Sequence, residues 1–407
     1  LMFNDSRQAA AFFAPYLEDT YGRLQRRRLV YQGLEKAGAA DESTYPGDVI
    51  ADTRMRAADV KVFGRRISRS EQDRIVAPWV MAEAVNVDDR QSLEGVGLVR
   101  ISLERDPAWR APQPVRDLGL SEDEAWDFMA ELVRTLRLQG AVTMPENVSP
   151  ADDAFAPRFG PIYARKQGPE ARHKVLAWLP ARGTNRRVDY VTKILAKLGR
   201  SDDANSILGK VWDYLTAVTT PVDWLAKTQQ KGLGELRQVD HELIRFRLVS
   251  EDATVYLCDT CHRVVPVSVR GVCPALSCAG TLSPFAPPPT LADRDHYRAI
   301  YRGMYPVPLK VMEHTAQWVN TEAAKIQQDF IHGEVNALSC STTFELGVDV
   351  GELQAVMLRN MPPSTANYVQ RAGRAGRRAG AAALVVTYAQ RRSHDLTHFA
   401  APQTMMT

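Results

Sequence analysis

The chain has 407 residues, of which 45% are hydrophobic and 24% charged, and its formal net charge is +3. This length predicts two or three domains, and the composition excludes a chain that is disordered throughout. The longest apolar stretch, Ala379 to Tyr388, contains Gly380 and Thr387 and is far shorter than the roughly 20 residues that a membrane helix needs. We therefore expect a soluble, cytoplasmic protein that has no membrane partner.

Residues 1–37 predict a strand, a tight turn and a long helix, because an apolar triplet is followed by a helical apolar pattern. The apolar triplet Leu1-Met2-Phe3 has no initiator signature and no signal peptide and resembles the inside of a strand, so the chain is expected to be a piece of a longer protein. Another helix is predicted over 121–138, where Ser121 and Glu124 form a capping box ahead of an apolar stripe.

Two amphipathic helices are predicted within 189–218, and a strand pair is predicted around 239–249. Two helices followed by a β-hairpin form the outline of a winged helix, and an ordinary helical insertion fits the same pattern equally well. Proline-rich segments at 144–161 and 284–289 are predicted linkers.

After residue 291 the pattern changes to strands that alternate with helices. This alternation predicts an α/β fold with a parallel, doubly wound sheet. The predicted strands cover 309–313, 336–340, 355–359 and 382–387, and the predicted helices cover 321–331 and 366–374.

Arginine outnumbers lysine by 40 to 11. Arginine suits phosphate contacts, but a GC-rich genome also favours its codons, so the excess alone identifies no partner. Two basic clusters leave the same alternatives open, since such clusters either follow phosphates or form solvated faces. They contain Arg65, Arg66 and Arg69 in one case, and Arg182, Arg186 and Arg187 in the other.

The strongest local motif is a run of arginines in the last predicted helix. Arg371, Arg374 and Arg377 are spaced i, i+3 and i+6, which places them on one ridge of a helix. Gly373 and Gly376 remove side chains beside this ridge and allow a close approach. Aligned guanidinium groups indicate an anionic ligand such as a triphosphate, and a solvated basic helix is the alternative.

Polar side chains directly follow the predicted strand that contains Cys340. Ser341 and Thr342 come at its carboxyl end, where α/β sheets bind ligands. Gly347 allows a close backbone approach, and Asp349 can accept a hydrogen bond from a ribose hydroxyl. Cys340 itself is predicted to lie in the packed core.

The other strong signal consists of four cysteines. Cys258 and Cys261 form a C-x2-C pair, and Cys273 and Cys278 form a C-x4-C pair after a short spacer. Two such pairs can wrap one tetrahedral Zn²⁺ as a structural zinc ribbon, and four thiolates leave no open position for catalysis. Cysteines in this pattern also point to a reducing compartment. The c-type haem pattern that ends at His262 lacks an export signal, so His262 is predicted to be an exposed neighbour of the ligands.

Together these residues resemble a known family. Residues 341–349 and 368–378 resemble motifs V and VI of superfamily 2 DEAD/DEAH-box helicases, and residues 1–8 resemble their motif IV. Residues 311–317 resemble the strand that precedes motif V. The amino-acid sequences of these motifs are most similar to those of the large bacterial helicases with a cysteine module. This group includes the mitomycin-repair and phage-defence-island helicases. The resemblance covers the C-terminal, second RecA-like part of such a helicase.

The resemblance implies specific roles. Arg374 and Arg377 are then the arginine fingers that stabilise charge on the γ-phosphate of ATP, and Gln370 connects the nucleotide to the nucleic acid. The resemblance also places Gly347, Asp349 and Arg371 near the nucleotide. The residues expected to face the nucleic-acid backbone are Asn4, Ser6, Arg7, His314, Thr315, Gln317, Ser341 and Thr342.

The chain departs from the family in two respects: it contains no G-x-x-x-x-G-K-[ST] phosphate loop, and about 270 residues separate the helix after motif IV from the strand that starts at Leu309. Asp123 and Glu124 superficially match a DExx box, but they open an amphipathic helix and are interpreted as a helix cap. The first RecA-like domain is therefore expected to be absent from this chain. ATP and Mg²⁺ binding would require that domain, supplied by the same protein or by a partner subunit.

We expect a RecA-like sheet that is interrupted by a large α+β insertion. The domains are predicted as 1–40 and 290–407 for the RecA-like part, 41–250 for the insertion and 251–285 for the zinc ribbon. The predicted function is the C-terminal part of an ATP-dependent DNA helicase or translocase in DNA repair or anti-phage defence, with RNA the less favoured partner. The alternative is a non-catalytic nucleic-acid-binding or scaffold protein with a degenerate RecA-like fold.

Overall fold

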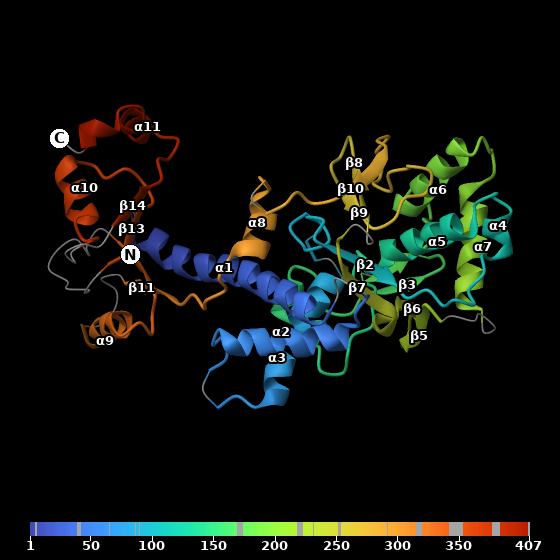
Figure 1. Cartoon of the computed structure of the whole chain (residues 1–407), viewed down its shortest axis with the longest axis horizontal. Helices are drawn as coiled ribbons and strands as arrows, with labels where there is room; N and C mark the ends of the chain where they lie inside the picture. Colours follow the sequence, from blue (N-terminus) through green and yellow to red (C-terminus); the bar gives the residue numbers. More distant parts are fainter. Residues whose placement is uncertain are drawn as a thin grey trace. The chain divides into compact units, whose positions relative to one another are not determined.

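The chain forms two compact units. Figure 1 shows the whole chain, coloured along the sequence from the N-terminus to the C-terminus. Unit 1 comprises Leu1–Gln25 with Val307–Thr407, and unit 2 comprises Arg26–Pro306. The computed structural model describes residues 1–4, 6–38, 42–64, 66–85, 87–88, 90–168, 174–217, 223–230, 232–250, 254–290, 292–314, 320–341, 353–376 and 383–405. Within these ranges, none of the helices combines the length and the apolar character needed to cross a bilayer.

Unit 1 is built on a five-stranded parallel sheet with the order β11-β12-β1-β13-β14. The first strand of the chain lies at its centre, where Met2 pairs with Ser339 on one side and with Met357 on the other. The strands are β1 (Met2–Phe3), β11 (Val311–His314), β12 (Ala337–Cys340), β13 (Ala355–Leu358) and β14 (Leu384–Thr387). The predicted α/β class and its parallel sheet are confirmed.

Helices bury both faces of this sheet. On one face, Phe13 of α1 packs with Met2 and Val311, and on the other, Phe3 packs with Ile326 of α9. Successive strand residues point to opposite faces, which is why Met2 and Phe3 enter different cores. The helices are α1 (Arg7–Lys36), α9 (Asn320–Ile331), α10 (Thr365–Ala372), α11 (Ser393–Ala400) and the 3-10 helix η4 (Pro402–Met405).

Unit 2 is the α+β insertion. Its central helix, α5 (Glu122–Arg137), starts with the predicted capping box: Glu124 N donates to Ser121 Oγ over 3.2 Å, and Ser121 N donates to Glu124 Oε2 over 3.0 Å. The other helices are α2 (Pro46–Asp59), α3 (Arg69–Ala84), α4 (Gln113–Arg116), α6 (Arg186–Lys197), α7 (Ala204–Thr216), α8 (His296–Gly303), η1 (Asp153–Phe155) and η2 (His241–Leu243).

Three small sheets complete unit 2, with the orders β4-β3-β6-β5, β2-β7 and β10-β8-β9. Their strands are β2 (Val99–Leu103), β3 (Tyr163–Arg165), β4 (Val175–Ala177), β5 (Leu225–Gln230), β6 (Gly234–Val239), β7 (Ile244–Leu248), β8 (Val255–Cys258), β9 (Val264–Val265) and β10 (Leu282–Phe285).

The predicted strand pair around 239–249 is wrong. β6 and β7 exist, but β6 pairs with β5 and β3, whereas β7 pairs with β2. The turn η2 separates them, because Asp240 accepts a hydrogen bond from Glu242 N and redirects the chain. The sequence analysis missed β5, whose residues are mainly polar. The order α6, α7 and the β5–β6 hairpin retains the outline of a winged helix, extended by β3 and β4.

The segments predicted as linkers are packed into unit 2. Val148 and Phe155 are buried, so the segment 144–161 is anchored to the core by these two side chains. The segment that starts at Pro284 begins inside β10, and the Arg298 guanidinium lies 5.5 Å from the centre of the Phe285 ring. The proline-rich composition of these segments therefore indicates irregular backbone and does not indicate mobile linkers.

The two ends of unit 2 are joined to each other. Arg28 of α1 donates to the carbonyl oxygens of Tyr301 and Met304 over 2.7 and 3.0 Å. Arg27, one residue earlier, forms an ion pair of 2.9 Å with Glu83, and its Nη1 donates to the Tyr301 hydroxyl. The entry and exit of the chain are thereby fixed together at α8.

Candidate functional site

The carboxyl ends of the central strands form one edge of the unit 1 sheet. Asn4 follows β1, Ser341 follows β12, and His314 ends β11. The backbone N–H of Asn4 donates to Cys340 O over 2.8 Å, so the ends of β1 and β12 stay in register beyond the strands themselves. Parallel strands present such residues at a common edge, where open α/β sheets bind their ligands.

Asn4 holds this edge together. Its Nδ2 donates to Ser339 Oγ over 2.9 Å, and its Oδ1 accepts from Arg359 Nη1 over 3.0 Å. The side chain is only 1% exposed. Arg359 in turn lies with its guanidinium 3.7 Å from the centre of the Phe13 ring. Asn4 therefore connects β1, β12 and the end of β13, and Arg359 is a residue of this edge that the sequence analysis did not single out.

Ser6 and Arg7 are exposed at the start of α1, beside this edge. Ser6 Oγ accepts from Ala9 N over 3.2 Å and thereby caps the helix. The helix N-terminus carries a partial positive charge, which favours an anion nearby.

His314 is buried to 8% exposure, and its Nε2 contacts Gln327 Nε2 of α9 at 2.9 Å. Burial lowers the pKa of His314, so its ring is neutral at pH 7. A neutral ring can accept a hydrogen bond from the Gln327 amide. Thr315 and Gln317, predicted to follow it on the nucleic-acid side, lie outside the described residues.

The arginine ridge is only partly helical. Arg371 lies in the last turn of α10, is 1% exposed and sits 5.5 Å from the centre of the Phe3 ring. Arg374 follows the end of the helix at Gly373, so its expected helical position is wrong. Gly376 has φ +72°, and a Cβ there would lie 2.6 Å from Ala383 Cβ, which requires glycine and ends the helical path.

Arg374 is 8% exposed and lies just before the residues that join the amino end of β13, where Gly376 N donates to Leu353 O over 3.0 Å. Burial raises the pKa of the Cys340 thiol, and the charges of the N-terminal amino group and of Arg374 partly oppose this rise. Cys340 lies in the apolar core, as predicted. Gln370 is exposed on α10. The predicted residues that lie outside the described part of the chain are Thr342, Gly347, Asp349 and Arg377.

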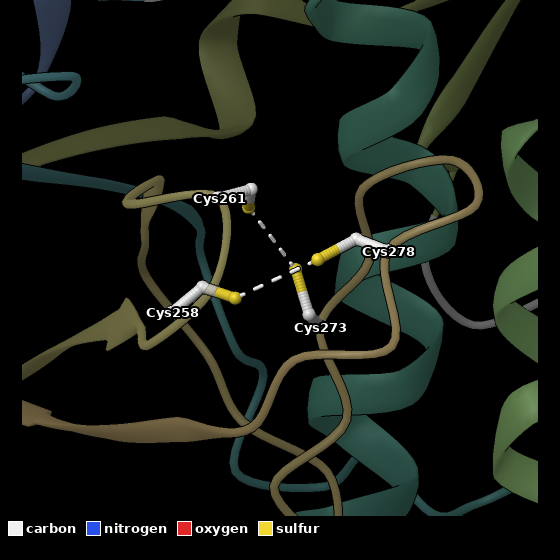
Figure 2. Close-up of side chains that lie close together, drawn as sticks. All are labelled: Cys258, Cys261, Cys273 and Cys278. Atoms are coloured by element: carbon white, nitrogen blue, oxygen red, sulfur yellow. Dashed lines mark hydrogen bonds between the residues drawn. The ribbon is translucent and has the colours of Figure 1, made fainter.

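The four cysteines of the predicted ribbon form a compact cluster in unit 2. Their sulfur atoms all lie within 4.8 Å of one another, and Figure 2 shows the four side chains directed toward a common centre. Cys258 Sγ is 3.7 Å from Cys278 Sγ, and Cys261 Sγ is 3.7 Å from Cys273 Sγ. A tetrahedral ion with sulfur ligands at about 2.3 Å sets its sulfurs about 3.8 Å apart, so the cluster fits a metal of zinc's size.

Local backbone geometry sets up this cluster. His262 N donates to Cys258 O over 3.1 Å in the first turn, and Cys278 N donates to Ala275 O over 3.1 Å in the second. A Cβ on Gly280 would lie 2.5 Å from Cys258 Sγ, so only glycine leaves room for the sulfur. His262 is exposed and outside the cluster, as predicted.

The thiols of the cluster differ in their electrostatic environment. Burial opposes ionisation of Cys258, but the backbone N–H groups of Cys261 and Thr260 outweigh it and lower the pKa of Cys258 to about 7. Burial raises the pKa of Cys273. A divalent cation stabilises all four as thiolates, and four thiolates leave no open coordination position. This centre is therefore suited to a structural metal.

The structure decides the role of one basic residue. Arg187 is 3% exposed and donates to Ala177 O, Trp178 O and Thr135 Oγ1 at 2.7, 3.1 and 2.7 Å, so it belongs to the core of unit 2. Arg66 and Arg69 are exposed, which keeps both interpretations of that cluster open. A basic run in a sequence does not reveal which of its members is buried.

Residues 300–379 match the helicase conserved C-terminal domain. The chain is 43% identical over 112 residues to the Druantia protein DruE of Escherichia coli, an alignment that covers 24% of this chain and 6% of DruE. It is 38% identical over 69 residues to the ATP-dependent helicase HRQ1 of Saccharomyces cerevisiae, which covers 17% of this chain and 6% of HRQ1. The chain therefore spans only a small part of these relatives.

A crystal structure of the DUF1998 helicase MrfA bound to DNA and AMPPNP is 25% identical in sequence where it aligns. The alignment covers 27% of this chain and 15% of MrfA, with a TM-score of 0.23.

Proposed function

We propose that the chain, whose residues 300–379 match the helicase conserved C-terminal domain, is part of an ATP-dependent DNA helicase or translocase of superfamily 2 and of the bacterial cysteine-module type. In this proposal, residues 1–40 and 290–407 are the second RecA-like lobe. Residues 41–250 are an insertion, and 251–285 are a zinc ribbon. The first RecA-like lobe comes from another part of the same protein or from a partner subunit.

The observation that carries the proposal is that Arg371 and Arg374, both within the matched domain, are buried in unit 1, with Arg371 against Phe3 of β1. An arginine such as Arg374 can approach a γ-phosphate held by the facing lobe and stabilise the charge that develops during hydrolysis. We assign the same role to Arg377. Gln370 connects nucleotide and nucleic acid, and Gly347, Asp349 and Arg371 lie on the nucleotide side.

We propose that the carboxyl edge of the sheet, where Asn4 and Ser341 follow their strands, grips a DNA strand. Ser6 and Arg7 are exposed there, and the start of α1 favours a phosphate. Asn4 acts by holding the strand ends in position. His314, Thr315, Gln317, Ser341 and Thr342 complete the proposed contact, and ATP with Mg²⁺ drives the alternating closure of the two lobes. The proposed pathway is DNA repair or anti-phage defence.

We further propose that the four-cysteine centre holds Zn²⁺. Cys258, Cys261, Cys273 and Cys278 would bind it as thiolates, in agreement with the sulfur spacing of about 3.7 Å. The bound ion supplies a cross-link within a small sheet and no reactive position. Its role in this proposal is structural.

The test is an Arg374→Ala variant of the full protein, including its first RecA-like lobe. We expect kcat for ATP hydrolysis to fall by roughly 10³-fold or more, because an arginine finger contributes at least that much. The Kd for single-stranded DNA should change by less than about threefold, because the variant leaves most phosphate contacts in place. Both are measured by a coupled ATPase assay and fluorescence anisotropy.

Arg391→Ala, at an exposed position after β14, is the matched control and should leave both values unchanged. An Arg374→Ala variant that keeps its ATPase contradicts the assigned role. A wild-type protein that binds DNA and never hydrolyses ATP favours the non-catalytic scaffold instead.

A further inference from the structure

The C-x4-C loop of the metal centre is held from outside the ribbon by α6. Lys193 Nζ donates to Ala275 O over 2.9 Å and to Cys278 O over 3.1 Å. Asp189 Oδ2 accepts from Ser277 N over 3.2 Å. Both side chains therefore contact the backbone of the loop that carries two of the four sulfurs.

These two side chains also bind each other. Asp189 and Lys193 are one helical turn apart and form an ion pair of 2.8 Å, and both are only about one-fifth exposed. The ion pair orients the ammonium group toward the loop carbonyls, because the carboxylate fixes it on the other side. Asp189 and Lys193 form a preformed clamp on one face of α6.

The second cysteine loop has greater need of such support than the first. The first turn is short and is closed by bonds from Cys258 N to Arg263 O and from His262 N to Cys258 O. The second loop has two more residues between its cysteines, and its Ser277 has a left-handed φ of +58°, close to the +56° of His262 in the first turn. Its backbone conformation is therefore costly for a non-glycine residue and is offset by contacts from α6.

The charges at the metal centre also support a role for Lys193. Four thiolates around a divalent cation carry a net charge of −2, and the centre is partly buried. The Lys193 ammonium lies against the carbonyl of a ligand residue, where its charge favours the loaded state over the empty one. Arg270 adds a separate anchor, an ion pair of 2.7 Å with Glu124 at the start of α5.

We propose that Asp189 and Lys193 are positioning residues of the metal centre and couple metal binding to the packing of α6. This inference rests on the proposed metal centre. Groups outside the ligand shell orient the ligands, and removing one typically costs 10- to 100-fold in metal affinity. Coupling is reciprocal, so a bound metal must stabilise α6 to the same degree that α6 stabilises the metal. The ribbon is then a brace for the α6–α7 pair and not an independently mobile finger.

The first experiment compares Lys193→Met with the wild-type chain. Methionine keeps most of the apolar stem and removes the ammonium group. We expect metal release to a chromophoric chelator to be roughly 10- to 100-fold faster, and Asp189→Asn to lie between the two. Lys197→Met, at an exposed position one turn later on α6, is the matched control and should release metal at the wild-type rate.

Release at the wild-type rate from both Lys193→Met and Asp189→Asn overturns the inference. Cys258→Ser separates this outcome from failure of the metal centre. If the wild-type chain holds one metal ion and Cys258→Ser holds none, the centre stands and the clamp alone has failed. A wild-type chain that binds no metal overturns the centre and the clamp together.

A second experiment needs no substitution. Hydrogen exchange of the backbone amides is measured in the wild-type chain before and after the metal is removed. Exchange in α6 should become faster, whereas α2, which packs against α3 and β7, should be unaffected. Unchanged exchange in α6 overturns the inference even if the variants fail to fold.

Discussion

At the scale of single residues, Asp127 is a carboxylate held where its charge is unfavourable. It lies on α5, and burial, with contributions from the carboxylates of Asp123 and Glu131, raises the pKa of Asp127 to about 6 although Arg100 opposes the rise. The unfolded chain ionises this group near pH 4. The folded state therefore binds more protons than the unfolded state between about pH 4 and pH 6, and its stability falls as the pH rises through that window.

We expect Asp127→Asn to raise the free energy of unfolding at pH 8 by about 2 kcal/mol, since a shift of about two pKa units corresponds to that order. Well below pH 4 the variant and the wild type should be equally stable, because the wild-type group is then protonated in both states. Urea unfolding at the two pH values measures this. Glu42→Gln, at an exposed position before α2, is the control and should show no such pH dependence.

The residues of the metal centre differ in how predictable they were. The spacing of the cysteines predicts a metal centre, because a pair of thiolates on a turn has few other uses. Lys193 and Asp189 carry no such signal, since an i, i+4 ion pair on a helix is most often a surface feature. Only the fold brings α6 against the cysteine loop. The same holds for Arg359, which reaches Asn4 from a different strand.

At the scale of elements, a buried ion network joins α3, α5 and the loop between α3 and β2. Glu94 accepts two hydrogen bonds of 2.7 Å from Arg137 Nη2 and one of 3.3 Å from Arg134. Arg137 also donates to Ala84 O at the end of α3. Glu94 is 1% exposed, so its charge is tolerated only because two arginines compensate it.

We expect Glu94→Ala to lower the free energy of unfolding by about 3–5 kcal/mol, because it leaves two buried guanidinium groups without their main counter-charge. Asp19→Ala, which removes the exposed ion pair with Arg23, is the contrasting variant and should cost less than about 0.5 kcal/mol. Thermal unfolding followed by circular dichroism compares the two. Equal effects would mean that the Glu94 network contributes no more than a surface pair.

Elements with strong periodicity were predicted correctly, and those without it were not. α5 has a capping box and a continuous apolar stripe, and its bounds agree with the prediction to within one residue at each end. β5 is polar on most positions, and β7 finds its partner far away in β2, which no local pattern reveals. The end of α10 was misjudged because spacing alone does not show that Gly373 ends the helix.

At the scale of the whole molecule, unit 2 has its own core and closed ends. Leu29, Val30 and Leu34 of α1 are fully buried, as is Tyr301 of α8. These residues lie outside the insertion bounds of 41–250 and 251–285 that the sequence suggested. Composition could not find them, because α1 is one uninterrupted helix.

We therefore expect a fragment of residues 26–306 to fold alone, with one cooperative urea transition and a full complement of metal. A shorter fragment, 41–290, should have a clearly lower transition midpoint, because each of the four large side chains it lacks contributes about 1.5–3 kcal/mol through burial. Two fragments of equal stability would show that the ends of α1 and α8 are dispensable. An unfolded longer fragment would show that unit 2 depends on unit 1.

The bond between Arg28 and the end of α8 has a consequence for how the central strand finds its place. β1 must pair with strands that lie more than 300 residues later in the chain, and closing so long a loop is entropically costly. Once Arg28 holds Tyr301 and Met304, the free chain between β1 and β12 shrinks roughly sixfold, which lowers the closure cost by about 1.5 kcal/mol. The folded insertion thus lowers the entropic cost of completing the sheet that it interrupts.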